Sequence, residues 1–372
     1  MTKQQFYPFK FLVMSRYARQ TTLPEIGEKG QAMLRQASVL VIGAGGLGCP
    51  ALLYLASSGI GHIGIVDHDC VDESNLQRQI LYNMQDIGKP KTEIAGKKLE
   101  ALNPGCVIDT YQIRLDRHNV GPLVQSYDLI MDGSDNYETK YILNDACAQH
   151  GKPLVYAALH RFRAQIGLFD PRGGGACYRC LYPSEPMVPA QNCQEAGVLG
   201  PVAGMAGTVQ ATEAIKYIIS HDCFETLKGR ILVIDAKKMT TTLVSVDRDK
   251  DCKTCSKQIY PSLLTSVFSE VFITEIHPDE LRMKASYALL LDVRELDEWD
   301  EGRIPGATHF PLSKLQTGIN PQLKDEDQII VYCLKGIRSL KAAQILKDMG
   351  YTNIVSLEGG FDAWLKHQNS AA

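Results

Sequence analysis

The chain has 372 residues, of which 22% are charged and 45% are hydrophobic, and its formal net charge is −3. A length of this order predicts two or three domains, and a nearly balanced charge excludes the basic surface on which nucleic-acid-binding proteins depend. Residues 9–14 are too few to form the apolar region of a secretory signal, so we expect a cytoplasmic protein. Eleven cysteines indicate a reducing compartment in which thiols bind metals or react.

Residues 41–66 contain no Asp, Glu, Lys or Arg, and a stretch of this length can form a membrane-spanning helix. Seven glycines interrupt it, and each glycine inside a helix costs about 1 kcal/mol relative to alanine. We therefore predict a strand at 39–42, a glycine turn, a helix at about 49–58 and a strand at 63–67. This arrangement is a βαβ unit rather than a membrane span.

Strand and helix patterns then alternate to about residue 260. The predicted strands are 127–133, 153–159 and 229–236, and the predicted helices are 136–151 and 202–220. Residues 256–270 interrupt this rhythm, and a new α/β pattern follows with strands at 288–295, 328–334 and 353–360. We therefore expect an α/β protein with a domain boundary at 256–270, a linker apolar enough to pack on a neighbouring domain.

The turn after the first strand, Gly43-Ala-Gly45-Gly46-Leu-Gly48, matches the glycine pattern of dinucleotide-binding proteins. Asp67 lies where the ribose-binding acid of such proteins is found. On its own, this pattern favours a nicotinamide-dependent dehydrogenase, and a non-catalytic nucleotide-binding partner protein is a further alternative.

The residues that follow favour a triphosphate instead. Arg78 and Lys91 supply positive charge, and Asp135 and Asn136 come directly after the strand at 127–133. Hydride transfer needs neither two cations nor a second acid, whereas a nucleoside triphosphate needs cations for its phosphates and a carboxylate for its magnesium. A single basic residue would usually be solvated surface charge, but the clustering of these four residues argues against that interpretation.

Taken in order, the motifs of residues 15–255 resemble those of the MoeB/ThiF adenylyltransferases, relatives of the ubiquitin-activating enzymes. The motifs are RYARQTTLPEIGEKGQ, GAGGLG, DHD, SNLQRQ, GKPK, DGSDN, CYRC, NCQEAGVLGPVAG and CKTC. The resemblance implies a Rossmann-like domain that binds ATP and Mg²⁺, in a homodimer in which Arg19 reaches the site of the other subunit. The implied nucleotide- and magnesium-binding residues are Gly43, Gly45, Gly46, Asp67, Ser74, Asn75, Leu76, Gln77, Arg78, Lys91, Asp135 and Asn136. Arg78, Asp135 and Arg19 are implied to be catalytic.

The resemblance also implies the reaction. The substrate would be the C-terminal Gly-Gly carboxylate of a small ubiquitin-like carrier protein of the MoaD/ThiS type, which attacks the α-phosphate of ATP to give an acyl adenylate and pyrophosphate. Two anions repel each other, so such a site has to supply cations and fixed dipoles where negative charge accumulates. Whether the carrier serves molybdopterin synthesis, thiamine synthesis or tRNA thiolation stays open.

Four cysteines form two CxxC pairs, Cys177 with Cys180 and Cys252 with Cys255. Four thiolates in this pairing suit a tetrahedral structural zinc ion, although a redox pair or unrelated buried thiols are alternatives. Because such coordination is closed, we expect the metal to have no catalytic role.

Cys193 belongs to neither pair. The resemblance implies that a cysteine at this position can link covalently to the activated carrier tail, and the alternative is an inert loop cysteine. The other cysteines of residues 15–255 carry no motif, and we interpret them as small core residues. They are Cys49, Cys70, Cys106, Cys147 and Cys223.

Residues 271–368 resemble a rhodanese domain through ALLLDVRELDEWDEGRIPGATHFPL, CLKGIRS and SLEGGFDAW. Cys333 follows the segment QIIVY, and we expect residues 334–338 to wrap around its sulfur with their N–H groups pointing inward, before a helix that begins at Ser339. Such a cradle lowers the pKa of a thiol and stabilises a persulfide anion. Asp292 and Arg294 are expected to fix the loops around the site.

The similarly folded dual-specificity phosphatases are the main alternative for this domain, because they also use a loop that runs from a cysteine to an arginine. Their loop is generally longer, whereas four residues separate Cys333 from Arg338 here. A shorter loop fits a sulfane sulfur better than a phosphate.

The two domains together suggest consecutive chemistry. Sulfur from Cys333, supplied by a donor such as a cysteine desulfurase, would displace AMP and leave a thiocarboxylate on the carrier. Ubiquitin-like activation and conjugation without sulfur transfer is the alternative. The expected organisation is an N-terminal extension at 1–14, an adenylyltransferase domain at 15–255, a linker at 256–270 and a smaller α/β rhodanese-like sulfurtransferase domain at 271–372.

Overall fold

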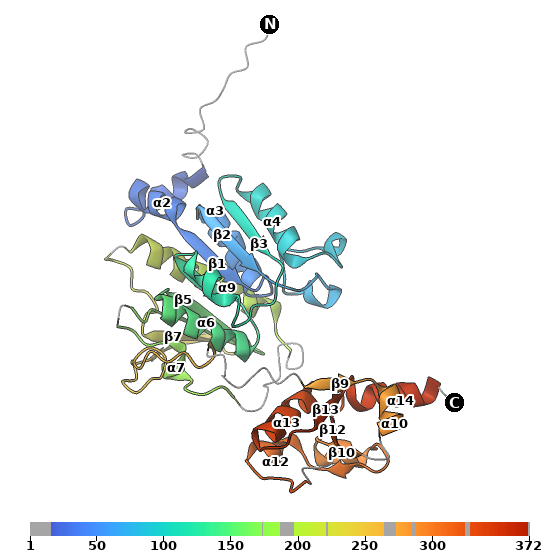
Figure 1. The fold of residues 1–372 in the computed structure, drawn as a ribbon. Coiled ribbons are helices and arrows are strands. Elements are labelled where there is room, and N and C mark those ends of the chain that lie inside the picture. Colours follow the sequence, from blue (N-terminus) through green and yellow to red (C-terminus); the bar gives the residue numbers. More distant parts are fainter. Residues whose placement is uncertain are drawn as a thin grey trace. The chain divides into compact units, whose positions relative to one another are not determined.

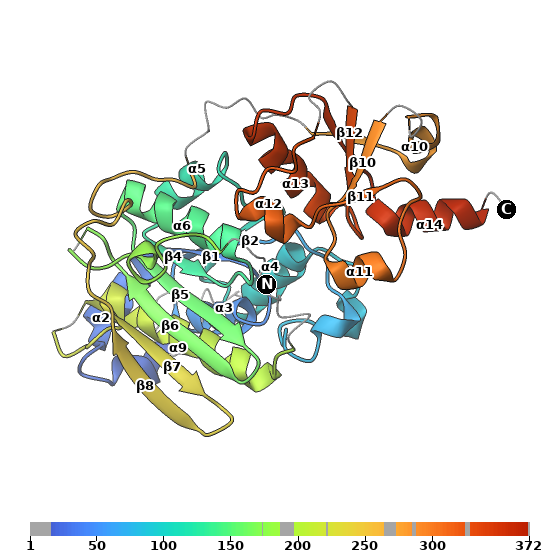
Figure 2. The ribbon, with the colours of Figure 1, turned by 90° about the horizontal axis from the view of Figure 1, so that it is seen from below.

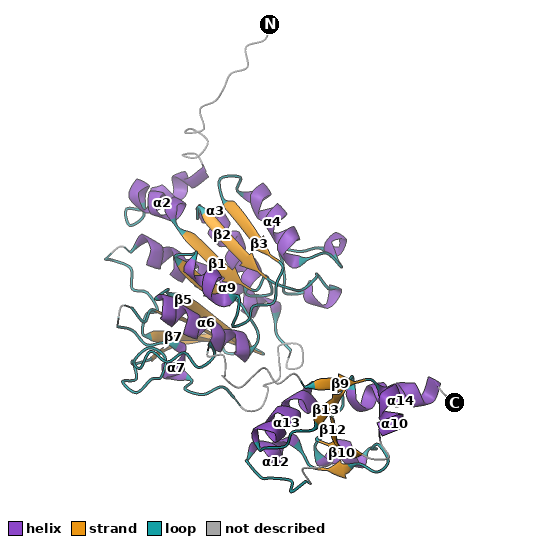
Figure 3. Cartoon of the chain, viewed as in Figure 1, coloured by secondary structure: helices purple, strands orange, loops and turns teal. Residues whose placement is uncertain are grey.

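The computed structural model describes residues 16–172, 174–186, 197–220, 222–263, 273–284, 288–323 and 328–370. The chain divides into two compact units, Met1–Leu264 and Thr265–Ala372. Each unit has its own sheet with helices packed on it (Figure 1 and Figure 3). Among the described residues, no helix is long and apolar enough to cross a membrane.

An eight-stranded sheet forms the centre of the first unit, in the order β3-β2-β1-β4-β5-β6-β7-β8. Neighbouring strands run parallel from β3 to β5, and β6, β7 and β8 continue the sheet in antiparallel pairs. Figure 2 shows the antiparallel strands side by side at one end of the sheet. The strands are β1 (Ser38–Ile42), β2 (His62–Val66), β3 (Val107–Tyr111), β4 (Leu129–Asp132), β5 (Leu154–His160), β6 (Arg163–Phe169), β7 (Arg230–Asp235) and β8 (Thr240–Ser245).

Alternating residues of β1 enter two different cores, because successive side chains of a strand point to opposite faces. Val39 and Val41 belong to one core with residues of α3, α4 and α9, and Leu40 and Ile42 belong to the other with residues of α5 and α6. Helices therefore cover both faces of the sheet, as in doubly wound α/β proteins. The helices are α2 (Gly27–Gln36), α3 (Gly48–Ser58), α4 (Lys91–Leu102), α5 (Val120–Gln125), α6 (Tyr137–His150), α7 (Tyr178–Leu181) and α9 (Gly200–Ile219), with short 3₁₀ turns η1 (Glu73–Asn75) and η2 (Met84–Asp86).

A five-stranded parallel sheet forms the centre of the second unit, in the order β11-β10-β12-β13-β9. Leu291 and Val331 face a core shared with α12 and α13, and Leu290 and Ile330 face a core shared with α10 and α14. The strands are β9 (Thr274–Ile276), β10 (Ala288–Asp292), β11 (Thr308–His309), β12 (Gln328–Tyr332) and β13 (Ile354–Leu357). The helices are α10 (Pro278–Lys284), α11 (Leu296–Asp300), α12 (Leu312–Gln316), α13 (Ile337–Asp348) and α14 (Gly360–Ser370).

The predicted βαβ unit is confirmed as β1, α3 and β2. The strands predicted at 288–295, 328–334 and 353–360 are too long, because β10, β12 and β13 end earlier and their last predicted residues turn into loops. The patterns did not predict β3, β6, β8, β9 or β11. No residue of β3 or β8 is buried, so these two strands lack the apolar alternation that marks a half-buried strand.

Candidate functional site

The glycine loop between β1 and α3 packs tightly against the turn that follows β4. Gly43 has a φ of 91°, and a Cβ at this position would lie 2.8 Å from the carbonyl oxygen of Gly133. A Cβ at Gly48 would lie 1.9 Å from the carbonyl oxygen of Gly43. Neither position has room for a side chain, so the loop can follow this path only with glycine. The packing brings the predicted nucleotide loop next to the segment that leads to Asp135.

Hydrogen bonds fix both the N–H and the carbonyl of Ala44. Its N–H donates to Asp67 Oδ2 over 2.8 Å, and its carbonyl accepts hydrogen bonds from the Tyr82 hydroxyl at 2.9 Å and the Cys49 thiol at 3.3 Å. Burial raises the pKa of Cys49 to about 12, so this thiol keeps its proton and can donate. Asp67 also accepts a hydrogen bond from the Asp69 N–H at 2.9 Å. The Asp67 carboxylate therefore links the glycine loop to the turn after β2 and orients the loop.

The segment at 74–78 lies beside the glycine loop. A Cβ at Gly46 would lie 3.4 Å from Cγ of Arg78, and the Arg78 guanidinium donates to the Ser74 carbonyl over 3.1 Å. Asn75 Oδ1 accepts from Gln79 Nε2 at 2.7 Å, which ties the turn to itself. Ser74 and Gln77 are exposed, Leu76 and Arg78 are half-buried, and Asn75 is buried.

Lys91 places a positive charge at the start of α4. The residue is 4% exposed, and its ammonium pairs with the half-exposed carboxylate of Asp69 at 2.8 Å. An ammonium can donate to more than one partner, so Lys91 can bind Asp69 and an anionic ligand together. Because the Asp69 N–H donates to the Asp67 carboxylate, the residue that pairs with Lys91 is also tied to the acid that orients the glycine loop.

Asp135 and Asn136 are both exposed in the loop after β4. The Asn136 side chain accepts from the Thr139 N–H at 2.9 Å and so caps α6. Sequence reasoning missed Lys140, whose buried ammonium donates to Asp132 Oδ2 at 2.8 Å, the Ser134 carbonyl at 3.0 Å and the Ala157 carbonyl at 2.8 Å. Lys140 therefore holds in place the loop that carries Asp135.

Arg19, predicted to act across a homodimer, lies on a helical segment at 16–21 and is exposed. Among the described contacts, no hydrogen bond joins it to the glycine loop. Cys193 falls within 187–196, outside the described residues.

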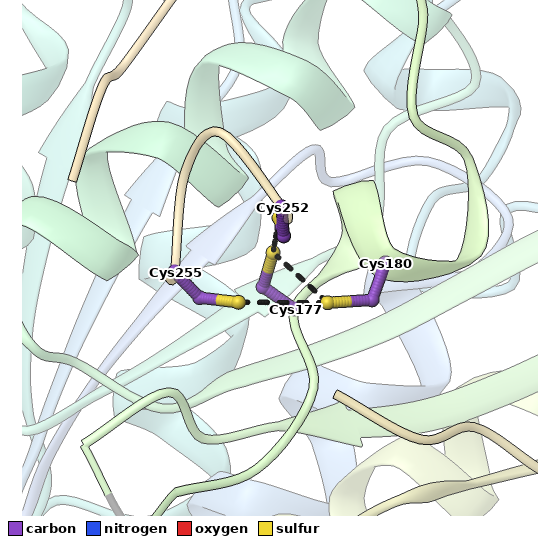
Figure 4. Close-up of side chains that lie close together, drawn as sticks. All are labelled: Cys177, Cys180, Cys252 and Cys255. Atoms are coloured by element: carbon purple, nitrogen blue, oxygen red, sulfur yellow. Dashed lines mark hydrogen bonds between the residues drawn. The ribbon is translucent and has the colours of Figure 1, made fainter. Parts of the chain in front are cut away.

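The four cysteines of the CxxC pairs come together at one place, although 75 residues separate Cys177 from Cys252 and Cys180 from Cys255 (Figure 4). Sγ–Sγ distances are 3.6 Å between Cys177 and Cys252, 3.5 Å between Cys180 and Cys255, and 4.0 Å between Cys177 and Cys180. Four sulfurs about 2.3 Å from a tetrahedral zinc ion lie roughly 3.8 Å apart, so the geometry fits zinc.

The cysteine cluster is also chemically suited to a cation. Hydrogen bonding to Cys180, then to Cys255, and burial together raise the pKa of the Cys177 thiol far above its usual range. Four thiolates this close repel one another strongly, and a divalent cation is what allows all of them to lose their protons.

Both cysteine pairs are anchored to α6 through a single buried carboxylate. Arg179, inside the first pair, donates to Asp145 at 2.9 and 3.0 Å, and Thr254, inside the second pair, donates to the same carboxylate at 2.9 Å. Asp145 is fully buried and also accepts from the Ser262 N–H at 2.8 Å. Asp145 thus fixes the spacing of two segments that are far apart in the sequence.

The five cysteines outside the CxxC pairs and Cys193 were expected to be core residues of residues 15–255, and this expectation is only partly correct. Cys49, Cys106 and Cys147 are buried as expected, but Cys70 and Cys223 are exposed. Cys70 lies in the turn after β2 and Cys223 lies in the turn between α9 and β7, and at both places the next residue, Val71 or Phe224, packs on the core instead.

In the second unit, Cys333 follows β12 and is 2% exposed. The helix α13 begins at Ile337 and not at Ser339, so Arg338 belongs to the helix and the loop is shorter than predicted. Gly336, with a φ of 90°, allows this tight entry into the helix. Arg338 donates to Glu298 at 2.6 and 2.5 Å, and this hydrogen bonding raises the pKa of the guanidinium and lowers that of the carboxyl.

The N-terminus of α14 binds the carbonyl groups of the cysteine loop. The Phe361 N–H donates to the Cys333 carbonyl at 2.8 Å, and the Asp362 N–H donates to the Leu334 carbonyl at 3.0 Å. A Cβ at Gly360 would lie 2.3 Å from the Cys333 carbonyl oxygen, so this contact requires glycine. The sequence motif SLEGGFDAW includes this segment but does not predict these hydrogen bonds.

Asp292 and Arg294 form a buried pair at the end of β10. The guanidinium donates to both carboxylate oxygens at 2.6–3.0 Å and to the Gly302 carbonyl at 2.6 Å. The pair fixes the loop after β10, in the structural role expected for it.

Comparison with known proteins gives the family. Residues 17–255 match the model of the ThiF family, and residues 278–367 match that of the rhodanese-like domain. The chain belongs to the ThiF family. It is 40% identical over 95% of its length to a probable adenylyltransferase/sulfurtransferase MoeZ of Mycobacterium tuberculosis, covering 93% of that protein. It is 35% identical over 94% of its length to the adenylyltransferase and sulfurtransferase MOCS3 of Drosophila sechellia, covering 83% of that protein.

These relatives identify the chain as an adenylyltransferase with a sulfurtransferase domain, and ATP is the nucleotide of this family. The expected fold class, a Rossmann-like domain followed by a rhodanese-like domain, is confirmed. Solved structures of E. coli MccB share the fold, with a TM-score of 0.58 and 22% identity over 65% of this chain and 74% of that one.

The anchoring of the cysteine pairs leads to a prediction. Asp145→Asn keeps the shape of the side chain but removes the buried counter-charge of Arg179, which, among the described residues, keeps only the half-exposed carboxylate of Glu185 at 3.4 Å. Loss of one partner of a buried pair costs about 3–5 kcal/mol. We expect a lower melting temperature and faster transfer of zinc to a coloured chelator. Zinc content, about one ion per chain in the wild type, should be low from the outset in Cys177→Ser.

Asp251→Asn is the matched control, because Asp251 adjoins Cys252 but is exposed. Equal zinc release and equal melting temperature in Asp145→Asn and Asp251→Asn would show that the buried carboxylate does not fix the cysteine pairs.

Proposed function

We propose that the chain activates the C-terminal Gly-Gly carboxylate of a small ubiquitin-like carrier protein as an acyl adenylate and converts it into a thiocarboxylate with sulfur carried on Cys333. The observation that carries this proposal is the union, in one chain, of a ThiF-family domain with a rhodanese-like domain that keeps its cysteine. Relatives with the same two domains are named for both activities. A conjugating enzyme without sulfur transfer would have no use for Cys333.

For the adenylation step, we assign the phosphates of ATP to the glycine loop and the N-terminus of α3, where backbone N–H groups and the helix dipole favour anions. Arg78 lies beside Gly46 of this loop and Lys91 pairs with Asp69, and both would neutralise charge as the carboxylate approaches the α-phosphate. Asp135 has an exposed carboxylate whose oxygens suit Mg²⁺, and the bound ion would draw charge from the phosphates. Ser74, Asn75, Leu76, Gln77 and Asn136 complete the proposed nucleotide-binding set, and Arg19 would complete the site of a second copy in a homodimer.

For the sulfur step, ionised Cys333 attacks a sulfane sulfur. The new S–S bond forms at Cys333, and the donor leaves with the electrons of the bond that breaks. The terminal sulfur then attacks the acyl carbon, and AMP leaves with the electrons of the C–O bond, which produces an acyl disulfide. A thiolate must then attack the Cys333 sulfur to release the thiocarboxylate. Cys193 is the candidate, and a cellular dithiol would reduce the resulting disulfide.

The proposed organisation follows from these steps. We assign adenylation to residues 15–255 and sulfur transfer to residues 271–372, and we propose that these domains, joined by 256–270, move relative to each other during the reaction. The donor that loads Cys333 would be a persulfide-bearing protein such as a cysteine desulfurase, and the carrier would be of the MoaD/ThiS type.

The nucleotide assignment predicts the effect of Asp135→Ala. With ATP, Mg²⁺ and a carrier ending in Gly-Gly, the wild type should catalyse carrier-dependent exchange of labelled pyrophosphate into ATP. The variant should lose about a hundredfold or more of this rate, because one fixed contact to developing charge typically contributes that much. Glu225→Ala, which removes an exposed acid before β7, is the control. Full exchange by Asp135→Ala would refute the metal assignment.

Because adenylation and sulfur transfer are assigned to different domains, Cys333→Ala should give a different result. This variant should keep nearly all pyrophosphate exchange, because adenylation uses only charges of the first domain, and it should lose transfer of sulfur from thiosulfate to cyanide. Cys223→Ala, which removes an exposed cysteine, should keep both activities. If Cys333→Ala still transferred sulfur, the proposed role of the second domain would be wrong.

A further inference from the structure

Cys333 lies buried in an apolar environment. Its side chain belongs to the core cluster that contains Leu291, Val331 and Ala342. The thiolate, and not the thiol, is the nucleophile in sulfur transfer. A reactive Cys333 therefore needs hydrogen-bond donors directed at its sulfur.

Two serine hydroxyls lie next to this sulfur. Cys333 Sγ is 3.7 Å from Oγ of Ser339, in the first turn of α13, and that oxygen is 3.0 Å from Oγ of Ser356, on β13. Both serines are fully buried. A line of three groups therefore runs from Cys333 through Ser339 to Ser356.

The direction of these hydrogen bonds follows from the number of protons. The Ser339 hydroxyl donates to the Gly336 carbonyl at 2.7 Å. Because a hydroxyl has a single proton, Ser339 must accept from both neighbours, the Cys333 thiol and the Ser356 hydroxyl. This describes the protonated state of the cysteine.

Ionisation of Cys333 reverses one of these bonds. The thiol proton leaves to solvent or to a base, and the Ser339 hydroxyl can then turn from the Gly336 carbonyl to the thiolate. The Gly336 carbonyl is not left without a partner, because it also accepts from the Leu340 N–H at 3.3 Å. Ser356 continues to donate to the Ser339 oxygen, which strengthens the bond from Ser339 to sulfur.

We propose that Ser339 is the side-chain donor that stabilises the ionised sulfur of Cys333, and that Ser356 positions Ser339 for this task. The inference rests on the proposed function of Cys333 as the sulfur carrier. In the transfer from thiosulfate, the Sγ–S bond forms while the S–S bond of thiosulfate breaks and sulfite leaves with its electrons. Discharge to an acceptor returns the electron pair to Sγ, where Ser339 again meets a negative charge.

Other charged groups surround the site but occur largely in pairs. Arg338 on α13 faces Glu298 on α11, and Arg294 faces Asp292 after β10. Lys335 in the loop is exposed, and Asp362 on α14 is half-buried. None of the hydrogen bonds described for these side chains reaches the Cys333 sulfur, whereas that of Ser339 does.

If the two serines had only a structural role, the hydroxyl of Ser339 would be sufficient for it. The bond from Ser339 to Gly336 would fasten the first turn of α13 without any help from Ser356. The one hydrogen bond described for the Ser356 side chain joins it to Ser339, so its hydroxyl affects the loop only through that residue.

The test is the pH dependence of alkylation at Cys333 in the full-length chain. Iodoacetamide reacts with thiolates, and mass spectrometry of the peptide that contains Cys333 separates it from the other cysteines. Ser339→Ala should move the midpoint of the rate profile upward by about one to two pH units, the size expected for loss of a hydrogen bond to a charged group. Ser356→Ala should move it upward by less, and Ser339→Thr should restore the wild-type midpoint. Thr317→Ala, which removes an exposed hydroxyl in the same domain, should leave it unchanged.

An unchanged midpoint in Ser339→Ala would overturn the proposal. If that variant failed to fold, Ser356→Ala would decide alone, since a shift supports the proposal and no shift overturns it. The measurement uses no ATP, carrier or sulfur donor. A failure of sulfur transfer by the wild type would therefore refute the proposed function while leaving this result standing.

Discussion

Each site depends on a buried ion pair that holds its loops in place. Lys140 with Asp132 holds the loop that carries Asp135, Arg179 with Asp145 holds the cysteine pairs, and Arg294 with Asp292 holds a loop of the rhodanese-like domain. All six side chains are at most 5% exposed. Loss of one partner from such a pair costs about 3–5 kcal/mol, because the other charge is left without compensation. Each pair also makes further hydrogen bonds to backbone or side-chain groups, and these contacts give a unique position to loops that have no regular structure.

The two domains use the same principle of placement. Reactive groups follow the carboxyl ends of parallel strands, where open α/β sheets bind their ligands. The glycine loop follows β1, Asp67 follows β2 and Asp135 follows β4, while Cys333 follows β12. After β1 and β12 the chain turns sharply into a helix, and Gly43 and Gly336 allow these two turns with positive φ angles. The proposed adenylation site is rich in charge, which suits anionic reactants. The surroundings of Cys333 are apolar, apart from the Ser339 hydroxyl 3.7 Å from its sulfur.

Local patterns predicted the parts of the sites that are close in the sequence. The glycine spacing predicted the βαβ unit, and the two CxxC spacings predicted a cluster that the structure brings together. Side-chain hydrogen bonds between distant residues could not be predicted, because no short sequence motif contains both partners. Asp145 and Thr254 are 109 residues apart, and Ser339 and Ser356 are 17 apart on different elements. The assignment of Cys70 and Cys223 to a core failed for a related reason. Cysteine is usually buried, but these two cysteines lie in turns, and there the side chains are exposed.

The central claim is that adenylation and sulfur transfer act in sequence on one carrier. Mass spectrometry of the carrier C-terminus tests it most directly, after incubation of the full-length chain with ATP, Mg²⁺, thiosulfate, a dithiol and a carrier ending in Gly-Gly. The account predicts replacement of one oxygen by one sulfur, and only when ATP and thiosulfate are both present. A carrier that is adenylated but never gains sulfur, or that gains sulfur without ATP, would contradict it.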